Sequence, residues 1–304
     1  MIGNRACPTC KSDVKAEVIC SKSQIDLSDF NSTREFFVGL RPEQLFFDYV
    51  RCRNCKLVYC DTYFDESELS ILYSNMPPNL VGDEIDIVDR THLGYAKRII
   101  KKCNGKSGRR YESLLELGAD LGLVTGPVVH RLGIKSGVLV EPNKVVRSDL
   151  HGSVNNGEDF EIVDDIKYME SSRKFDLVIA IHVIDHLLEP KLTLRNLYSQ
   201  IENEGKIFIV VHNQRSILAR LLKSKWPPYC LQHPQVFDKK TIRDLLEDVG
   251  FKKIEISRTT NYVGLKNGLK SLLDILKLPS SWTRYLPNAA IPFKFGNILV
   301  EAEK

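Results

Sequence analysis

From Tyr111 to the end of the 304-residue chain, short apolar runs alternate with helical patterns. The strand-like runs are Ser113–Leu117, Gly137–Val140, Phe175–Ile181, Lys206–Val211, Lys253–Ser257 and Asn297–Glu301. One helical pattern opens at Pro190 and closes at Gly205, and another spans Asp238–Val249, with an Asp cap and a terminal Gly250. This alternation predicts an α/β fold, a mainly parallel sheet with helices on both faces. Ligands of such sheets bind at the carboxyl ends of the strands.

The cysteines divide the chain, because six of the eight fall within the first 60 residues. Four of them form two CxxC pairs, Cys7 with Cys10 and Cys52 with Cys55, separated by 41 residues. Two such pairs supply the four thiolates of a tetrahedral zinc site, and four ligands leave no open position, so the site is expected to be structural. The alternatives are unrelated buried cysteines or a redox pair, and the latter fits less well because neither pair opens a helix after a strand.

These patterns divide the sequence into a zinc-ribbon-like β domain (1–75), a helical linker or cap (76–110) and an α/β domain (111–304). Short helices are expected at Asp65–Tyr73 and Thr91–Cys103. Apolar runs stay far below the roughly 18 residues that span a bilayer. The N-terminus has no apolar signal region, so we expect no membrane span and a cytoplasmic protein.

Charge argues against a nucleic-acid partner. Residues 1–75 carry 9 Lys and Arg against 11 Asp and Glu, and four zinc-bound thiolates would add negative charge. A nucleic-acid reader needs clustered positive charge. An RNA substrate therefore stays an alternative, favoured only if the basic segments further along the chain form one groove with the ribbon.

A glycine turn follows the first strand of the α/β domain. Glu116 ends the strand, Gly118 permits a sharp turn, Gly122 permits close backbone approach, and Glu141 ends the next strand. An acid at that place can hold both hydroxyls of a ribose. Both NAD(H) and S-adenosylmethionine fit this geometry. Asp120 would repel a pyrophosphate but tolerates a zwitterionic amino acid, so charge favours S-adenosylmethionine.

The same residues resemble the sequence motifs of a known protein family. The motifs are Glu116-x-Gly118-x-x-x-Gly122, Glu141, the string Phe175–His186 and the segment Gln232–Phe237 before the last long helix. They are similar to class I S-adenosylmethionine-dependent methyltransferases over about residues 92–303. The resemblance implies a Rossmann-like, mostly parallel seven-stranded sheet. The preceding CxxC…CxxC ribbon narrows it to bacterial methyltransferases of sugar, polysaccharide and natural-product pathways.

By this resemblance, Gly118 and Gly122 would pass under the methionine end of the cofactor, and Glu116 would face its amino group. Glu141 would hold the ribose, and Asp164 or Asp165 would contact the adenine, although turn chemistry explains that pair equally well. Asp120 replaces the usual small residue, and Gly126-Pro127 falls where the first helix forms, which predicts a late or kinked helix. A catalytically degenerate binding protein is therefore a second alternative, beside an RNA methyltransferase.

Methyl transfer to a hydroxyl or an acidic C–H needs orientation and then a base, and histidine is the natural base near neutral pH. His182, His212 and His233 follow strands or loops at the ligand edge and are the candidate catalytic residues, and His182 is also a candidate cofactor contact. For His186, helix packing is the simplest interpretation, and a metal pair with His182 is the alternative.

Two insertions, at about 213–235 and 259–293, are expected to shape the choice of acceptor. Both are basic and aromatic, and Trp226, Tyr229 and Tyr262 are the candidate substrate contacts. Basic and aromatic side chains suit a phosphate-bearing acceptor such as a nucleotide-linked sugar. A solvated, amphipathic lid explains the same pattern. The prediction is a small-molecule methyltransferase with S-adenosylmethionine as cofactor and a structural zinc ion.

Overall fold

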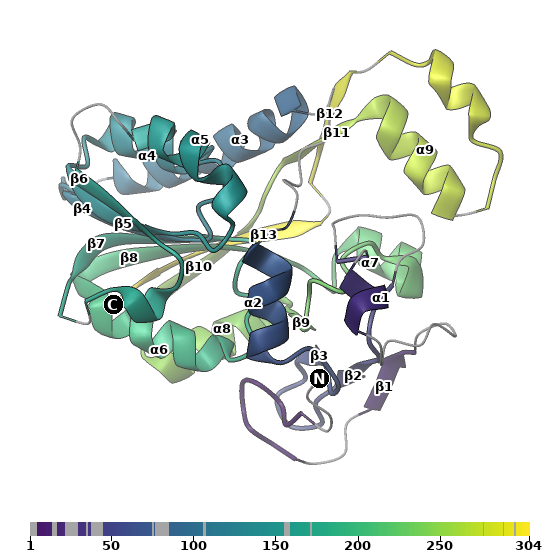
Figure 1. Ribbon diagram of the computed structural model, residues 1–304, viewed down its shortest axis with the longest axis horizontal. Coiled ribbons are helices and arrows are strands. Elements are labelled where there is room, and N and C mark those ends of the chain that lie inside the picture. Colours follow the sequence, from purple (N-terminus) through teal and green to yellow (C-terminus); the bar gives the residue numbers. More distant parts are fainter. Residues whose placement is uncertain are drawn as a thin grey trace.

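The computed structural model describes residues 5–13, 17–21, 30–34, 36–37, 45–74, 76, 85–105, 108–154, 159–170, 172–275, 277–287, 289–294 and 296–304. A large seven-stranded sheet forms the centre of the molecule (Figure 1). Its strands lie in the order β10 (Lys252–Arg258), β13 (Asn297–Glu303), β8 (Ile201–His212), β7 (Phe175–Ile181), β4 (Ser113–Leu117), β5 (Ser136–Val140) and β6 (Asp159–Val163). Only β13 runs antiparallel to its neighbours, which confirms the predicted Rossmann-like α/β fold.

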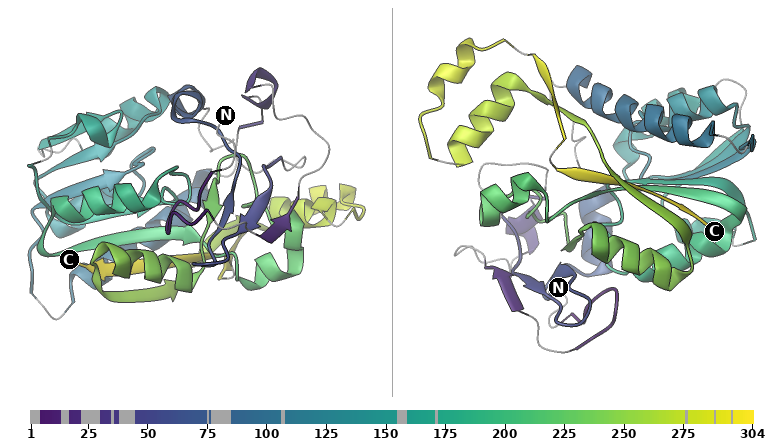
Figure 2. Two further views of the ribbon diagram at one scale, coloured as in Figure 1. Left: turned by 90° about the horizontal axis from the view of Figure 1, so that it is seen from below. Right: turned by 180° about the vertical axis from the view of Figure 1, so that it is seen from behind.

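Helices cover both faces of this sheet (Figures 1 and 2). One face carries α3 (Ile85–Cys103), α4 (Thr125–Leu132) and α5 (Arg147–Val154), and the other carries α6 (Pro190–Gln200) and α8 (Lys239–Val249). Alternate residues of each strand face opposite layers, so Leu114 packs toward α3 and α4 whereas Leu115 packs toward α6 and α8. The two hydrophobic cores therefore lie on either side of one sheet.

Several boundaries differ from the sequence prediction. Helix α6 ends at Gln200 rather than running to Gly205, because the chain enters β8 at Ile201. The strand β6 was absent from the predicted runs, since its exposed and half-buried residues break the apolar pattern. Helix α8 begins after Asp238, whose side chain accepts hydrogen bonds from the backbone amides of Lys240 and Thr241, as predicted for an Asp cap.

The N-terminal segment builds a second, four-stranded sheet from β1 (Glu17–Cys20), β2 (Tyr49–Arg51), β3 (Val58–Cys60) and β9 (Gln235–Val236). The last strand comes from the insertion expected at 213–235, so this sheet joins residues more than 170 positions apart. The short helix α1 (Phe30–Arg34) and the helix α2 (Glu66–Ser74) complete the segment. The division at residue 75 stays a prediction, and the structure adds that the segments on either side of it share a sheet.

Part of the predicted linker, residues 77–84 and 106–107, lies outside the described residues. Its described part forms α3, which packs beside α4. The first insertion holds α7 (Ile217–Leu222) and a 3-10 turn at Lys223–Lys225. The second holds a hairpin of β11 (Asn261–Gly264) and β12 (Ala290–Phe293), the helix α9 (Leu265–Ile275) and a 3-10 helix at Ser281–Tyr285. Both insertions follow strands that end at the same edge of the large sheet.

Candidate active site

The glycine turn after β4 needs glycine at both predicted positions. Gly118 and Gly122 have φ angles of 70° and 72°, in the left-handed region that side chains disfavour. A Cβ on Gly118 would lie 2.4 Å from Val183 Cγ2, and one on Gly122 would lie 2.1 Å from Ser153 Oγ. The amide of Gly118 donates to the carbonyl of Val140 at 2.8 Å, which draws the turn against the end of β5. The turn is therefore closely packed, and a side chain at either position would be strained.

Asp120 and Glu141 meet within this turn. The backbone amide of Asp120 donates to Glu141 Oε2 at 2.8 Å, and that of Asn143 donates to Glu141 Oε1 at 2.8 Å. Burial raises the pKa of both carboxyl groups above its usual value. Asp120 also has a positive φ of 46°. Glu141 thus closes the glycine loop through the backbone of Asp120, and each of its oxygens keeps a lone pair for a ligand hydroxyl.

Helix α4 starts at Thr125, so Gly126 and Pro127 occupy its first turn. Amides of the first turn have no partner within a helix, and a proline there removes no hydrogen bond. The predicted kink at this dipeptide therefore has no structural cause. The side-chain hydroxyl of Thr125 donates to Glu116 Oε2, and this contact ties the end of β4 to the start of α4.

Glu116 is 2% exposed. Burial raises its pKa to about 8, and the nearby carboxyl groups of Glu141 and Asp120 add to the rise, although the Thr125 hydroxyl opposes it. The side chain is consequently protonated in the folded protein at neutral pH. A cationic ammonium group beside it would favour the carboxylate form instead.

Asp164 and Asp165, the predicted adenine contacts, both have partners in the protein. Asp164 pairs with Arg147, whereas Asp165 accepts from the backbone amide of Lys167 at 3.0 Å and caps a 3-10 helix at Ile166–Tyr168. The local geometry is that of a turn. An adenine contact at either residue stays a prediction.

His182 directly follows β7 with a φ of 54°, and its amide donates to Val210 O at 2.8 Å. The amide nitrogen of Asn297 lies 3.2 Å from His182 Nε2 and 3.3 Å from the Tyr95 hydroxyl. That hydroxyl donates in turn to Asn261 Oδ1 at 2.9 Å. This network makes Nε2 an acceptor and leaves the proton on Nδ1, which is buried without a hydrogen-bond partner among the described residues.

His212 ends β8 beside His182, with ring centroids 4.6 Å apart. Its Nδ1 lies 2.6 Å from Asp185 Oδ2, and the same oxygen accepts its backbone amide at 3.2 Å. Asp185 is fully buried, and the histidines around it hold its pKa well below the usual range despite that burial. The pair fixes the Nδ1–H tautomer of His212 and leaves Nε2 with a free lone pair. Burial lowers the pKa of His212, and Asp185 offsets part of that effect.

His233 lies behind His212, with ring centroids 4.6 Å apart, and both of its nitrogens are engaged. Nδ1 donates to Pro228 O at 2.7 Å, and Nε2 lies 3.1 Å from His186 Nε2. His186 Nδ1 in turn lies 3.0 Å from the Tyr73 hydroxyl of α2. The helix-packing interpretation of His186 is therefore wrong, since this residue lies in a turn and links His233 to the N-terminal segment.

His182, Asp185 and His212 each place one potential ligand atom within 4.8 Å of the others. Their spacing could hold a metal ion. The hydrogen bonds favour another arrangement, because Asp185 already binds His212 and the Asn297 contact places the proton of His182 on Nδ1. The group is better described as a donor and an acceptor side by side, His182 Nδ1–H and His212 Nε2.

The predicted substrate contacts are mostly buried in the protein. Trp226 and Tyr229 are 1% and 6% exposed, and their rings lie 5.3 Å apart. Tyr229 also packs on Tyr49 of the N-terminal sheet, at 4.6 Å. These two rings support the histidines from behind, since the Trp226 ring lies 6.4 Å from that of His212. Tyr262 is half-buried on β11, where its amide donates to Thr91 Oγ1 at 2.8 Å.

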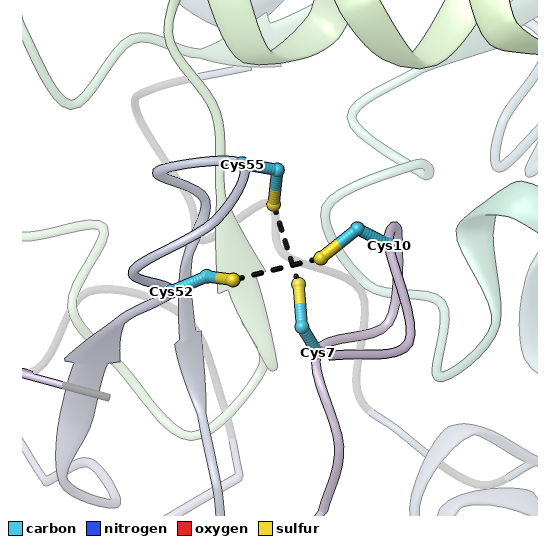
Figure 3. A group of neighbouring side chains, drawn as sticks. All are labelled: Cys7, Cys10, Cys52 and Cys55. Atoms are coloured by element: carbon cyan, nitrogen blue, oxygen red, sulfur yellow. Dashed lines mark hydrogen bonds between the residues drawn. The ribbon is translucent and has the colours of Figure 1, made fainter. Parts of the chain in front are cut away.

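The four predicted zinc ligands come together at one point (Figure 3). Cys7 Sγ lies 3.4 Å from Cys55 Sγ, and Cys10 Sγ lies 3.6 Å from Cys52 Sγ. A tetrahedral ion with Zn–S bonds of about 2.3 Å separates its sulfurs by about 3.8 Å. All eight cysteines are free thiols, so these distances do not come from disulfides. The donor set therefore fits a structural zinc ion.

Both CxxC pairs form the same turn. The amide of Lys11 donates to Cys7 O at 2.9 Å, and that of Lys56 donates to Cys52 O at 3.1 Å. Each lysine follows the second cysteine of its pair and has a positive φ, 55° and 67°. Cys20 and Cys60, which are outside the two CxxC pairs, lie buried in the aromatic core of the N-terminal segment.

Residues 89–256, more than half of the chain, match the family model described as a methyltransferase domain. The chain belongs to this family and is an S-adenosylmethionine-dependent methyltransferase. No curated protein matches the sequence. Among the described helices, none combines the length and the hydropathy needed to cross a bilayer.

Solved structures share the fold at low sequence identity. A chain from the complex between the Haloferax volcanii Trm112 methyltransferase activator and a methyltransferase is 12% identical, with a TM-score of 0.51 over 71% of this chain and 90% of its own. An S-adenosylmethionine-dependent methyltransferase from Archaeoglobus fulgidus is 20% identical, with a TM-score of 0.46 over 73% and 97%.

Substituting Gly122→Ala should disturb the glycine turn for two reasons: the backbone angle is left-handed, and the new Cβ would collide with Ser153. The matched control is Gly133→Ala, because Gly133 has a φ of 69° but no atom within 4 Å of its added Cβ. Both variants should lose about 1 kcal/mol of stability to the left-handed backbone. Only Gly122→Ala should also weaken S-adenosylmethionine binding, by at least about tenfold, as measured by calorimetric titration. Equal affinities in the two variants would contradict a cofactor site at this turn.

Substituting Glu116→Gln should stabilise the protein at neutral and alkaline pH. The folded state holds the Glu116 proton up to about pH 8, whereas the unfolded state releases it near 4.5, so wild-type stability falls as pH rises between these values. The glutamine removes this loss, worth on the order of 4 kcal/mol at pH 8, and can still accept from Thr125. Urea unfolding at pH 5 and pH 8 measures the difference. An equal effect at the two pH values would show that Glu116 does not titrate in this window.

Proposed function

We propose that this methyltransferase acts on a hydroxyl or an acidic C–H of a small polar acceptor, with His212 as the base. The observation that carries the proposal is the hydrogen bond of 2.6 Å between His212 Nδ1 and the buried carboxylate of Asp185. A carboxylate bound to one ring nitrogen orients the imidazole and stabilises the cation that forms when the other nitrogen takes a proton. The pair stands where β7 and β8 end, at the ligand edge of the sheet.

The residues around the glycine turn suit S-adenosylmethionine, which supplies an electrophilic methyl group on a sulfonium sulfur. Gly118 and Gly122 would hold its methionine end, because no side chain fits between the turn and its neighbours. Glu141 would accept from the ribose hydroxyls. Glu116, protonated at neutral pH, would ionise beside the ammonium group of the methionine end, and Asp164 or Asp165 would lie at the adenine.

The reaction requires the two histidines to act in complementary ways. The acceptor oxygen or carbon attacks the methyl carbon, the carbon–sulfur bond breaks, and its electron pair stays on sulfur. His212 Nε2 takes the proton of the acceptor, and the resulting cation is stabilised by Asp185. The Nδ1–H of His182, which has no partner among the described residues, can donate to a second oxygen of the acceptor and align it. His233 supports the ring of His212 and keeps its own nitrogens engaged.

A sugar or nucleotide-linked sugar suits this arrangement best. Neighbouring oxygens on a sugar would meet a donor and an acceptor whose rings lie 4.6 Å apart. Residues 76–304 carry 34 basic and 28 acidic side chains, a balance that accommodates an anionic acceptor. The N-terminal 75 residues are net negative, which argues against an RNA substrate.

We also propose that Cys7, Cys10, Cys52 and Cys55 hold a structural zinc ion that supports the histidines. The sheet next to this cluster reaches the His233 loop directly, since the Tyr49 hydroxyl donates to His233 O at 2.6 Å. The Cys60 amide donates to Pro234 O at 2.8 Å. Loss of the ion would loosen the sheet that holds this loop.

Substituting His212→Asn should lower kcat by about 10²- to 10⁴-fold, the range typical of a lost general base. The affinity for S-adenosylmethionine should stay unchanged, and the exposed His151→Asn is the matched control. The wild-type acid limb should lie below pH 6.5, because burial lowers the pKa of His212. Asp185→Asn should move that limb to lower pH, since the carboxylate raises the pKa of the ring. A kcat for His212→Asn within threefold of wild type would contradict the proposal.

The zinc proposal predicts about one ion per chain in purified protein, measured by atomic emission, and well under one in Cys52→Ser. Cys20→Ser should retain the metal, because Cys20 is a buried thiol away from the cluster. Chelation should lower the melting temperature of the wild type and of Cys20→Ser, but not of Cys52→Ser. Full zinc content in Cys52→Ser would sink the assignment.

A further inference from the structure

Two segments at one end of the molecule expose an unusual share of apolar side chains. They are residues 213–233, here the α7 loop, and residues 261–294, here the arm, and both lie at the same end in Figures 1 and 2. Together they make up 55 of the 304 residues. They hold eight of the fourteen exposed large hydrophobic residues in the described part of the chain: Ile217, Leu221, Val263, Leu272, Leu278, Trp282, Tyr285 and Ile291. Leu221 and Tyr285 are 74% and 75% exposed.

The same segments concentrate positive charge. They contain nine Lys and Arg against a single acidic residue, Asp274, which gives a net charge of +8. The whole chain is +4, so all other residues together are −4. Most of these basic side chains are exposed, among them Arg220, Lys270 and Lys277. The mild overall charge therefore conceals a strongly basic end on an otherwise acidic protein.

The positive charge and the exposed apolar side chains together indicate which kind of partner this surface binds. A second copy of this chain would bring the same positive charge against it, which disfavours self-association. Nucleic acid would neutralise the charge but offers no apolar phase for aliphatic side chains such as Leu221 and Leu278. An anionic lipid surface accepts both, because basic side chains pair with headgroups while Trp, Tyr and Leu enter the interface.

We propose that the α7 loop and the arm dock this methyltransferase onto an anionic membrane surface. The α7 loop follows the carboxyl end of β8, and the arm follows that of β10. Both strands run antiparallel to β13, so they end at the same edge of the sheet as the candidate active site. Docking therefore places the acceptor side of the enzyme toward the headgroups. The proposal rests on this surface and does not depend on which acceptor is methylated.

The full chain contains two tryptophans that make the test direct. Trp226 is 1% exposed and Trp282 is 48% exposed, so only Trp282 should respond to lipid. With phosphatidylcholine vesicles containing phosphatidylglycerol, emission should shift to shorter wavelength, and the protein should sediment with the vesicles. Pure phosphatidylcholine should produce neither effect, and added salt should weaken both. Trp282→Phe should abolish the shift without abolishing sedimentation. Absence of binding to the anionic vesicles at low salt would overturn the proposal.

Substitutions in the α7 loop and the arm test whether this surface binds the vesicles. Neutralising two exposed lysines, Lys270→Gln with Lys277→Gln, should lower the vesicle partition coefficient about 25-fold, since each basic side chain at an anionic surface contributes about 1 kcal/mol. Leu221→Ser with Leu278→Ser should lower it at least about tenfold. The matched control, Leu192→Ser with Lys252→Gln, changes an equally exposed leucine and a lysine on other elements and should bind as wild type.

Two further outcomes would overturn the proposal in favour of another occupant. One is a dimer in sedimentation equilibrium that the arm variants dissociate while vesicle binding stays unchanged. The other is RNA binding that the arm variants abolish, with no binding to anionic vesicles. Circular dichroism and S-adenosylmethionine affinity, unchanged in every variant, would show that these substitutions leave the fold and the cofactor site intact.

Discussion

The buried side chain of Gln235 joins the three parts on which the active site depends. Its amide nitrogen donates to the carbonyls of Ile184 at 3.0 Å and Leu187 at 2.7 Å, on either side of Asp185 and His186. Its oxygen accepts from Arg5 at 3.2 Å, and its backbone belongs to β9, which pairs with β3. The turn that carries Asp185 is therefore held by a residue of β9, which is itself part of the N-terminal sheet. An unsatisfied polar group here would cost roughly 1–3 kcal/mol, so the parts keep their relative positions.

This arrangement gives the cysteine cluster a meaning beyond stability. Cys7 and Cys52, one from each CxxC pair, belong to the same hydrophobic core as α6 and α8. The N-terminal sheet therefore packs on the face of the large sheet that these two helices cover. Tyr73 of α2 contacts His186, and Tyr49 of β2 contacts the backbone of His233. The proposed zinc ion would make this small sheet rigid for its size, because ligand bonds replace the large core that it lacks. The sheet would then hold in place the candidate catalytic side chains that the larger part of the chain supplies.

Buried carboxyl groups gather at the edge of the sheet where chemistry is expected, together with two of the eight non-glycine residues that have a positive φ in the described part of the chain. Asp120 and His182 adopt positive φ angles there without being glycine, Glu116 is buried with a raised pKa, and Asp185 is a buried carboxylate. Each of these features lowers stability unless a ligand or a specific partner compensates for it. The rest of the sheet is packed with aliphatic side chains that supply the compensation. The same edge carries the two insertions whose basic, apolar surface is unlike the remainder of the molecule.

The sequence by itself determined the parallel sheet, the glycine turn and the four clustered cysteines. These features are local, since apolar periodicity, glycine spacing and CxxC spacing are written in neighbouring residues. Only the tertiary structure decided the partners of the histidines. The sequence pattern gives Asp185 no role, predicts packing for His186, and predicts an acceptor contact for Trp226, which is buried in the structure. Their contacts join residues that are 27 to 113 positions apart or lie on different sheets, such as His212 with Asp185 and His186 with Tyr73. Pairings at such separations depend on how strands and loops meet in space, so a local sequence pattern does not predict them.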